Sequence, residues 1–289
     1  MVLDWDGTLT RRDTMFAMAE IVAARDRRLG VPSRAREQWT SFGNAYMDDY
    51  KAHDAKYRPA THERSTTSQE SAWLRSLESV ERQSVQRVEQ SRYFQGVTRA
   101  DIVGAARNAV VTGQVILREG WCELIMGLGQ TGDSVSVLSV NWSAMFIKDA
   151  LLYAADHSDL ETPAEHEHNL MSRIHIMEIR ANDIVGVDDS EGSPGLLTLN
   201  GSPGIRTSYD KLQHLPLQPE HINIYVGDSA TDFDCLTAVN LGICIRDEPL
   251  GSSQRVLADT FSRLGHEMHH ISSLSPSKVQ SVRQYITIV

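Results

Sequence analysis

The chain has 289 residues, a formal net charge of −10 at pH 7, 41% hydrophobic residues and 23% charged residues. These are ordinary values for a globular protein, and they exclude a disordered chain. The length is sufficient for one large α/β domain, or for a core domain with a second domain inserted into it. Residues 13–105 are nearly balanced in charge, so the acidity lies in the rest of the chain, and no basic domain suggests a nucleic-acid partner.

The cysteine and hydropathy patterns bear on the cellular compartment. The cysteines, Cys122, Cys235 and Cys244, have no C-x-x-C spacing, so we expect free thiols in a reducing compartment. No apolar run approaches membrane-spanning length, and Asp4 interrupts the apolar start before it could form a secretory leader. We expect a soluble cytoplasmic protein without a membrane partner, and the oligomeric state stays open.

The chain begins with a short apolar run, residues 1–3, which is followed by Asp4 and Asp6 and then broken by Gly7. Because side chains alternate along a strand, we expect both aspartates on one side of it, with Trp5 opposite. Two carboxylates this close repel each other, and holding both near a core requires a metal ion or a transferable proton. This stretch therefore predicts a buried strand that delivers two carboxylates at its carboxyl end.

The next ninety or so residues have a helical character. Residues 14–28, 36–57 and 68–93 are rich in Ala, Glu, Arg and Gln, with apolar residues three or four apart. This spacing predicts amphipathic helices, and no β-type alternation occurs among them. We therefore predict an all-helical domain over residues 13–105, inserted into a core domain formed by residues 1–12 and 106–289.

Helical and strand patterns alternate in the second part of the chain, which is typical of a doubly wound sheet. Strands are predicted at residues 134–138, 173–180, 222–226, 242–245 and 268–271. Helices are predicted at residues 118–128, 142–156, 208–215, 231–239, 252–264 and 276–289. The predicted fold class is therefore α/β, a Rossmann-like doubly wound parallel sheet with a helical insert.

An acidic turn follows the strand predicted at residues 222–226. Asp228 and Asp232 are four residues apart across this strand-to-helix turn, so both carboxylates can face one point. In open α/β sheets, sites form at the carboxyl ends of the strands, where we also expect Asp4 and Asp6. Carboxylates from two strand ends form an oxygen-lined site that suits Mg²⁺.

Other polar residues in the same region are candidates for binding a phosphoryl group. Ser139 follows a predicted strand and can donate a hydrogen bond to a phosphoryl oxygen, while Lys211 can neutralise its charge. Arg206 or Lys148 could take the place of Lys211. Asn141, two residues beyond Ser139, is a further candidate for this pocket. Together with the aspartates, these groups are the parts needed for phosphoryl transfer through an aspartyl-phosphate.

Four short motifs occur in the order D-W-D-G-T-L-T, V-L-S, a lysine, and G-D-S-A-T-D. This order resembles the four motifs of haloacid dehalogenase-like (HAD) phosphatases along nearly the whole chain. The helical region between the first two motifs looks like the cap of the phosphoserine-phosphatase-like branch. The resemblance implies a Rossmann-like core, a cap and Mg²⁺-dependent phosphate chemistry.

The resemblance also implies roles for individual residues. Asp4 would be the nucleophile and Asp6 the general acid/base, because an aspartate there can protonate a leaving alkoxide and then activate water. This favours phosphomonoester hydrolysis over dehalogenation or ATP-driven transport. The implied phosphate ligands are Ser139 and Lys211. The implied metal ligands are Asp4, the backbone carbonyl of Asp6, and Asp228, with Asp232 as a further ligand or a support.

A second, narrower resemblance concerns residues 138–143 and 225–236, together with the Gly-rich segment 185–206. These segments look similar to uncharacterised fungal members of the family and to the plant domain that hydrolyses thiamin monophosphate. The implied partner is a small phosphorylated metabolite, with thiamin monophosphate as one candidate. The alternatives are a prenyl or other phosphate of specialised metabolism, phosphotransfer by a mutase, or a catalytically idle binding protein of the same fold.

One face of the second predicted helix is aromatic. Trp39, Phe42, Tyr46 and Tyr50 recur at spacings of three, four and four residues. These rings could form a stacking wall for an aromatic substrate, or they could pack among the helices of the insert. Packing is the preferred interpretation.

Overall fold

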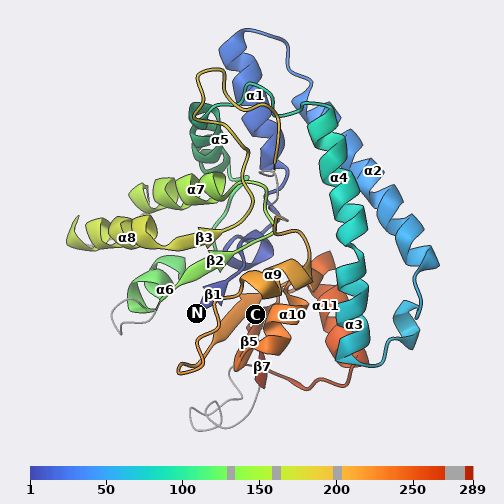
Figure 1. Cartoon of the computed structure of the whole chain (residues 1–289). Coiled ribbons are helices and arrows are strands. Elements are labelled where there is room, and N and C mark those ends of the chain that lie inside the picture. Colours follow the sequence, from blue (N-terminus) through green and yellow to red (C-terminus); the bar gives the residue numbers. More distant parts are fainter. Residues whose placement is uncertain (129–133, 158–163, 198–203, 271–283, 289) are drawn as a thin grey trace.

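The computed structural model describes residues 1–128, 134–157, 164–197, 204–270 and 284–288. At its centre is a seven-stranded sheet in the order β3-β2-β1-β4-β5-β7-β6, and every paired strand runs parallel to its neighbour (Figure 1). The strands are β1 (Val2–Leu3), β2 (Ser136–Leu138), β3 (Glu178–Arg180), β4 (Ile224–Gly227), β5 (Leu241–Ile245), β6 (Met268–His270) and β7 (Gln284–Ile288).

The central strands are buried on both faces. Leu3 of β1 and Val226 of β4 belong to one hydrophobic core, whereas their neighbours Val2 and Tyr225 belong to the other. This is the period of two expected of a strand, and helices that cover both faces explain why the strands are apolar without interruption. The predicted α/β fold with a parallel sheet is confirmed.

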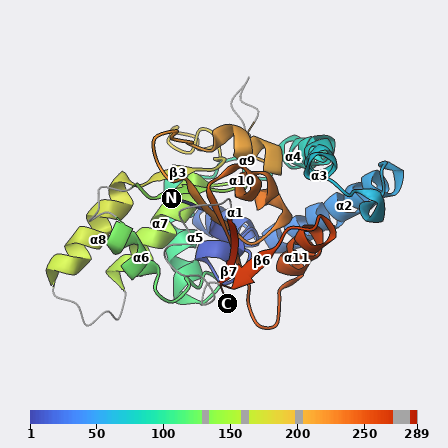
Figure 2. The same ribbon diagram turned by 90° about the horizontal axis from the view of Figure 1, so that it is seen from below.

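Five α-helices lie between residues 10 and 117. They are α1 (Ala17–Leu29), α2 (Ala35–Lys56), α3 (Thr67–Ser76), α4 (Glu78–Gln90) and α5 (Arg99–Val111). Figures 1 and 2 show α2, α3 and α4 together on one side of the molecule, while α1 and α5 lie closer to the sheet. The remaining helices are α6 (Trp121–Leu128), α7 (Ala144–Asp156), α8 (Ala164–Ile176), α9 (Ser208–His214), α10 (Phe233–Ala238) and α11 (Ser252–Arg263).

The chain enters and leaves this helical region at one short antiparallel contact. Thr10 and Leu117 form a β-bridge, and the Arg11 N–H donates to the Ile116 carbonyl at 2.8 Å. Helices α1 to α5 all lie between these two points, and α5 packs against both α1 and α7. The predicted domain boundary at residues 105 and 106 falls inside α5, and the division into core and cap stays a prediction.

Three secondary-structure predictions were wrong. The strand predicted at residues 173–180 is only Glu178–Arg180, because α8 occupies the chain as far as Ile176. The helix predicted at residues 68–93 is divided at Leu77 into α3 and α4. Of the helix predicted at residues 276–289, only residues 284–288 are described, and they form β7. Within the described residues no helix has the length and apolarity needed to cross a membrane.

Candidate active site

Three adjacent strands bring the predicted carboxylates to one edge of the sheet. β1 lies between β2 and β4, so Asp4, Ser139 and Asp228 follow neighbouring parallel strands. One carboxylate oxygen each from Asp4, Asp228 and Asp232 lies within 4.8 Å of the others, and all three residues are buried. The sequence argument that the strand ends would meet is correct for these aspartates.

Lys211 supplies a positive charge to this cluster from α9. Its Nζ donates to Asp4 Oδ1 and to Asp232 Oδ1, each at 2.7 Å, and the side chain has no exposed surface. Thr207 caps α9 by accepting a hydrogen bond from the Asp210 N–H at 3.2 Å, which fixes the start of the helix. Lys148, a sequence alternative to Lys211, instead donates to backbone carbonyls at the end of α8.

Burial and mutual repulsion make this cluster costly to ionise fully. Burial, followed by the charge of Asp232, raises the pKa of Asp4 well above its usual range. The same two causes raise the pKa of Asp228 to about 7. Burial alone would lower the pKa of Lys211, but Asp232 and Asp4 raise it above its ordinary value. Three carboxylates and one ammonium group therefore leave excess negative charge that a cation can neutralise.

Asp232 already uses both of its carboxylate oxygens. Oδ1 accepts from Lys211 and from the Tyr225 hydroxyl at 2.7 Å, while Oδ2 accepts from the backbone N–H groups of Asp228 at 3.1 Å and Ser229 at 3.0 Å. Within the described residues, the hydrogen bonds that Asp228 accepts come from two hydroxyl groups, those of Thr8 and Ser253, each at 3.1 Å. These contacts suit Asp232 to holding the turn and the lysine in place, and leave Asp228 better able to bind a cation.

The oxygen-only donor set fits Mg²⁺, which prefers few carboxylate ligands together with waters and phosphate oxygens. Asp4 and Asp228 are the carboxylates suited to hold it. Burial, followed by the charge of Asp232, raises the pKa of both groups, and a bound cation would favour their ionised forms. The donor atoms of the site therefore fit a hard divalent cation.

A tight turn after β1 places the backbone against Asp228. Gly7 has φ +74°, and a Cβ atom there would lie 2.4 Å from Asp228 Oδ2. The Arg118 guanidinium donates to the carbonyls of Gly7 at 2.8 Å and Thr8 at 2.9 Å, and pairs with Asp247. Glycine is therefore required both by the backbone conformation and by the close approach of the carboxylate.

Asp6 lies in this turn and not on the strand, so the alternation argued from the sequence does not describe it. Its Oδ1 accepts from the Thr14 N–H at 2.6 Å and the Thr14 hydroxyl at 2.5 Å, and its Oδ2 accepts from Asn141 Nδ2 at 2.9 Å. Burial, with a further contribution from Asp13, raises the pKa of Asp6 to about 6, although these hydrogen bonds favour the ionised form. Asp6 is thus a well-anchored carboxyl group that can exchange a proton near neutral pH.

Ser139 and Asn141 lie in the loop after β2. The Ser139 Oγ accepts from the Asn141 N–H at 3.1 Å, and both side chains are fully buried. Asn141 links this loop to Asp6, which favours a role in orienting Asp6. The phosphate-binding roles of Ser139 and Asn141 stay predictions.

Several residues that hold the site were missed in the sequence. Thr14 anchors Asp6, and it stood in a segment interpreted only as the start of a helix. Thr8 belongs to the first motif, and its place two residues after Asp6 was a usable signal. Nothing in the sequence indicated that Tyr225, Ser253 or Arg118 would reach the site, because each contact depends on the tertiary fold.

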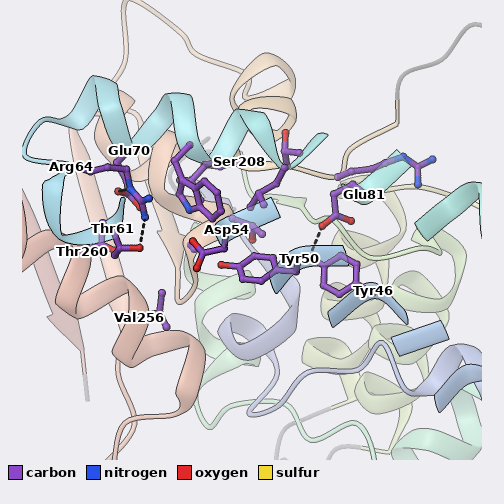
Figure 3. Close-up of a pocket in the computed structure, with 17 residues that line it drawn as sticks. Tyr46, Tyr50, Asp54, Thr61, Arg64, Glu70, Glu81, Ser208, Val256 and Thr260 are labelled. Carbon is purple, nitrogen blue, oxygen red and sulfur yellow. Dashed lines mark hydrogen bonds and ion pairs between the residues drawn. The ribbon is translucent and has the colours of Figure 1, made fainter. Parts of the chain in front are cut away.

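Two cavities lie between the helical insert and the site edge of the sheet. The larger has a volume of about 520 Å³ and includes Val140, Trp142 and Thr231, which are neighbours of site residues in the sequence. The smaller, of about 280 Å³, is shown in Figure 3. Tyr46 and Glu81 contribute to both cavities.

The aromatic face of α2 packs and also lines these cavities. Trp39 stacks on Tyr93, with ring centroids 5.7 Å apart, and meets Trp142 edge-on at 5.3 Å. Trp39, Phe42 and Tyr46 also line the larger cavity. The sequence favoured packing as the role of these aromatic residues, and the structure shows that they pack and also line a cavity.

Comparisons with known proteins cover most of the chain at low identity. No family model matches it. A CTO1 family protein of Schizosaccharomyces pombe is 28% identical over 257 residues, which are 85% of this chain and 81% of that protein. The match to a phosphoserine phosphatase structure with a phospho-aspartyl intermediate analogue spans 90% of this chain and 88% of that protein's chain, with 15% identity and a TM-score of 0.47. The match to a HAD family hydrolase of Salmonella enterica serovar Typhi spans 99% of this chain and 66% of that protein's chain, with 13% identity and a TM-score of 0.43.

Proposed function

We propose that this protein is a Mg²⁺-dependent phosphatase that hydrolyses a small-molecule phosphomonoester through an aspartyl-phosphate on Asp4. The observation that carries this proposal is the buried cluster of Asp4, Asp228 and Asp232 around Lys211. Such a cluster combines a fixed carboxylate nucleophile with a fixed positive charge and a hard cation site. These are the requirements of phosphoryl transfer.

In the first step, an Asp4 carboxylate oxygen attacks phosphorus and the bond from phosphorus to the leaving oxygen breaks. Lys211 holds the other oxygen of Asp4, which keeps the nucleophile in one orientation. Asp6 donates its proton to the leaving alkoxide, so that a neutral alcohol departs. The raised pKa of Asp6, about 6, supports a carboxyl group that carries a proton in part of the molecules near neutral pH.

In the second step, Asp6 accepts a proton from water, and the resulting hydroxide attacks the phosphorus of the aspartyl-phosphate. The acyl phosphate bond breaks, phosphate leaves, and the Asp4 carboxylate is regenerated. Thr14 and Asn141 keep Asp6 in place for both proton transfers. When bound, Mg²⁺ would be held by Asp4, the Asp6 carbonyl and Asp228, and would neutralise charge on the phosphoryl oxygens.

We also propose that the helical insert acts as a cap that restricts the substrate to small molecules. The cavities between the insert and the sheet support this, since their volumes suit a metabolite and not a folded protein. Thiamin monophosphate and prenyl phosphates are the candidates to be tested among such metabolites.

The test is the release of phosphate from a panel of small phosphomonoesters, including thiamin monophosphate, first with Mg²⁺ and then with EDTA. We expect turnover that requires Mg²⁺, and we expect Asp4→Asn to abolish it while the circular dichroism spectrum stays unchanged. Wild-type activity in Asp4→Asn would show that Asp4 is not the nucleophile. No turnover of any ester would favour the idle binding protein, and an isomerised phosphate ester as the main product would favour a mutase.

A further inference from the structure

The larger cavity has a mixed wall of aromatic and acidic groups. Its apolar lining includes Met15, Trp39, Phe42, Tyr46, Val140 and Trp142. Val140 and Trp142 flank Asn141, whose amide donates to Asp6, so the cavity wall includes the chain neighbours of a residue that holds the proposed acid/base. The leaving group of a phosphomonoester bound at Asp4 would therefore enter this cavity.

Glu81 contributes a half-buried carboxyl group to the lining. Its Oε1 accepts from the Tyr46 hydroxyl at 2.7 Å, and Figure 3 shows this contact at one end of the smaller cavity. No hydrogen bond to Glu81 Oε2 is found within the described residues, and Glu81 faces both cavities. Burial raises the pKa of Glu81 to about 7, so a cation in the cavity would help this carboxyl group to ionise.

Arg206 lines the same cavities. Its Nη1 and Nη2 atoms are enclosed in protein and have no hydrogen-bond partner in the described part of the chain. It also makes no ion pair with Glu81, although the two charges influence each other. Asp13, at the exposed end of the larger cavity, adds a second carboxylate. Two of the three charged side chains that line this cavity are therefore carboxyl groups.

We infer, on the basis of the proposed function, that the leaving group of the substrate is an aromatic or apolar moiety carrying a cationic nitrogen group, and that Glu81 binds this nitrogen. Aromatic faces attract cations, and a buried carboxylate forms a charge-assisted hydrogen bond with an ammonium group. Both features meet at Tyr46, whose ring lines the cavity while its hydroxyl orients Glu81.

The test compares three aryl esters that differ in charge: phenyl phosphate, para-(aminomethyl)phenyl phosphate and para-carboxyphenyl phosphate. We expect the wild-type kcat/KM for the aminomethyl ester to exceed that for phenyl phosphate by about tenfold, the effect of one charge-assisted contact. Glu81→Gln keeps an acceptor for Tyr46 but removes the charge, so this ratio should fall close to one. Tyr46→Phe should lower the ratio by a smaller factor, because it only frees Glu81 to move.

Glu78→Gln is the matched control, since Glu78 lies on the same helix, is exposed and pairs with Arg82 at 3.8 Å. It should keep the wild-type ratio. An unchanged ratio in Glu81→Gln, or a wild-type preference for the carboxyphenyl ester, would overturn the inference.

The two proposals fail in different ways. If none of the three esters is hydrolysed, the proposed function loses support, and binding of para-(aminomethyl)phenol measured by calorimetry decides the inference alone. A dissociation constant about tenfold weaker in Glu81→Gln than in the wild type would support it. Equal dissociation constants would refute it.

Discussion

Lys211 lies fully buried between Asp4 and Asp232, and its ammonium group donates a hydrogen bond to each carboxyl group at 2.7 Å. Desolvation of the three groups is expensive, so the arrangement is held by the rest of the fold rather than by the ion pairs themselves. A buried charge cluster of this kind is stable only while every member is present. Lys211 is therefore needed for the stability of the fold as well as for the proposed reaction.

Lys211→Met should lower the free energy of unfolding by about 3–5 kcal/mol, because it leaves the carboxylates buried without their partner. Urea denaturation followed by tryptophan fluorescence measures this loss. Lys51→Met is the control, since Lys51 is exposed on α2 and its replacement should change stability by less than about 0.5 kcal/mol. A loss below about 1 kcal/mol in Lys211→Met would show that the cluster relaxes or is hydrated.

Glu81 gives a prediction that depends on pH. Its folded-state pKa of about 7 lies above the ordinary value of 4.5, so the folded protein binds this proton more tightly than the unfolded chain does. Its contribution to stability is complete below the ordinary value and is lost as pH rises through about 7. Glu81→Gln should therefore gain about 1–2 kcal/mol relative to wild type between about pH 5 and pH 8, allowing for partial exposure.

Urea denaturation of the wild type and of Glu81→Gln at the two pH values gives this difference directly. Subtracting one protein from the other cancels the titration of the groups they share. Glu78→Gln, on the exposed side of α4, should show no such trend. If the stability difference between wild type and Glu81→Gln is the same at both pH values, the pKa of Glu81 is not raised.

At the scale of elements, the turn after β1 is the most constrained segment of the site. Gly7→Ala would combine a positive φ with a Cβ placed 2.4 Å from Asp228 Oδ2. Gly30→Ala is a matched control, because Gly30 has a similar φ of +68° but no atom within 4 Å of the added Cβ. The two variants share the backbone strain, about 1–2 kcal/mol, and differ in the contact with the carboxylate.

We expect Gly7→Ala to reduce phosphatase turnover by at least about tenfold, since a shift of about 1 Å in a reacting geometry has effects of that size. Gly30→Ala should lose stability but retain its turnover. Thermal unfolding and phosphate release, measured on both variants, separate the two effects. Equal turnover in the two variants would mean that the turn accommodates the methyl group without moving Asp228.

The elements that the sequence predicted well are those with a strong local pattern. The apolar runs before Asp4 and Asp228 are strands, because continuous apolar runs ended by Gly and Asp suit a sheet buried on both faces. The strand predicted at residues 173–180 was wrong because Ile174 and Ile176 mimic alternation. In the structure Leu170 and Ile174 are buried four residues apart, as in a helix, while Ile176 is 85% exposed.

The end of the chain was also predicted wrongly, although a local signal was present. Residues 284–288 contain Tyr, two Ile and Thr, which favour strands, yet a helix was assigned to the whole tail. β7 pairs with β5 and β6, and a parallel pairing of this kind depends on contacts distant in sequence. The order of the strands could not be predicted from local patterns for the same reason.

At the scale of the whole molecule, helices α1 to α5 contact the rest of the chain at more than their two connections. α3 lies beside α11 in Figure 1, and Glu70 of α3 accepts from Arg263 of α11 at 2.7 Å. Glu70 also accepts from Arg64 at 2.8 Å, and both Arg64 and Glu70 are buried. The sequence predicted the insert from its helical spacing, but it contained no signal for this contact, which joins residues 193 positions apart.

Glu70→Ala should weaken the attachment of the insert to the core, because it leaves the buried Arg64 guanidinium without its carboxylate. We expect a loss of about 3 kcal/mol in the free energy of unfolding and faster cleavage between α2 and α3 in limited proteolysis. Glu37→Ala removes a carboxylate from an exposed pair with Arg34 and should change neither measurement appreciably. If Glu70→Ala lowers stability without increasing cleavage there, Glu70 stabilises α3 locally, and the insert is held on the core by its other contacts.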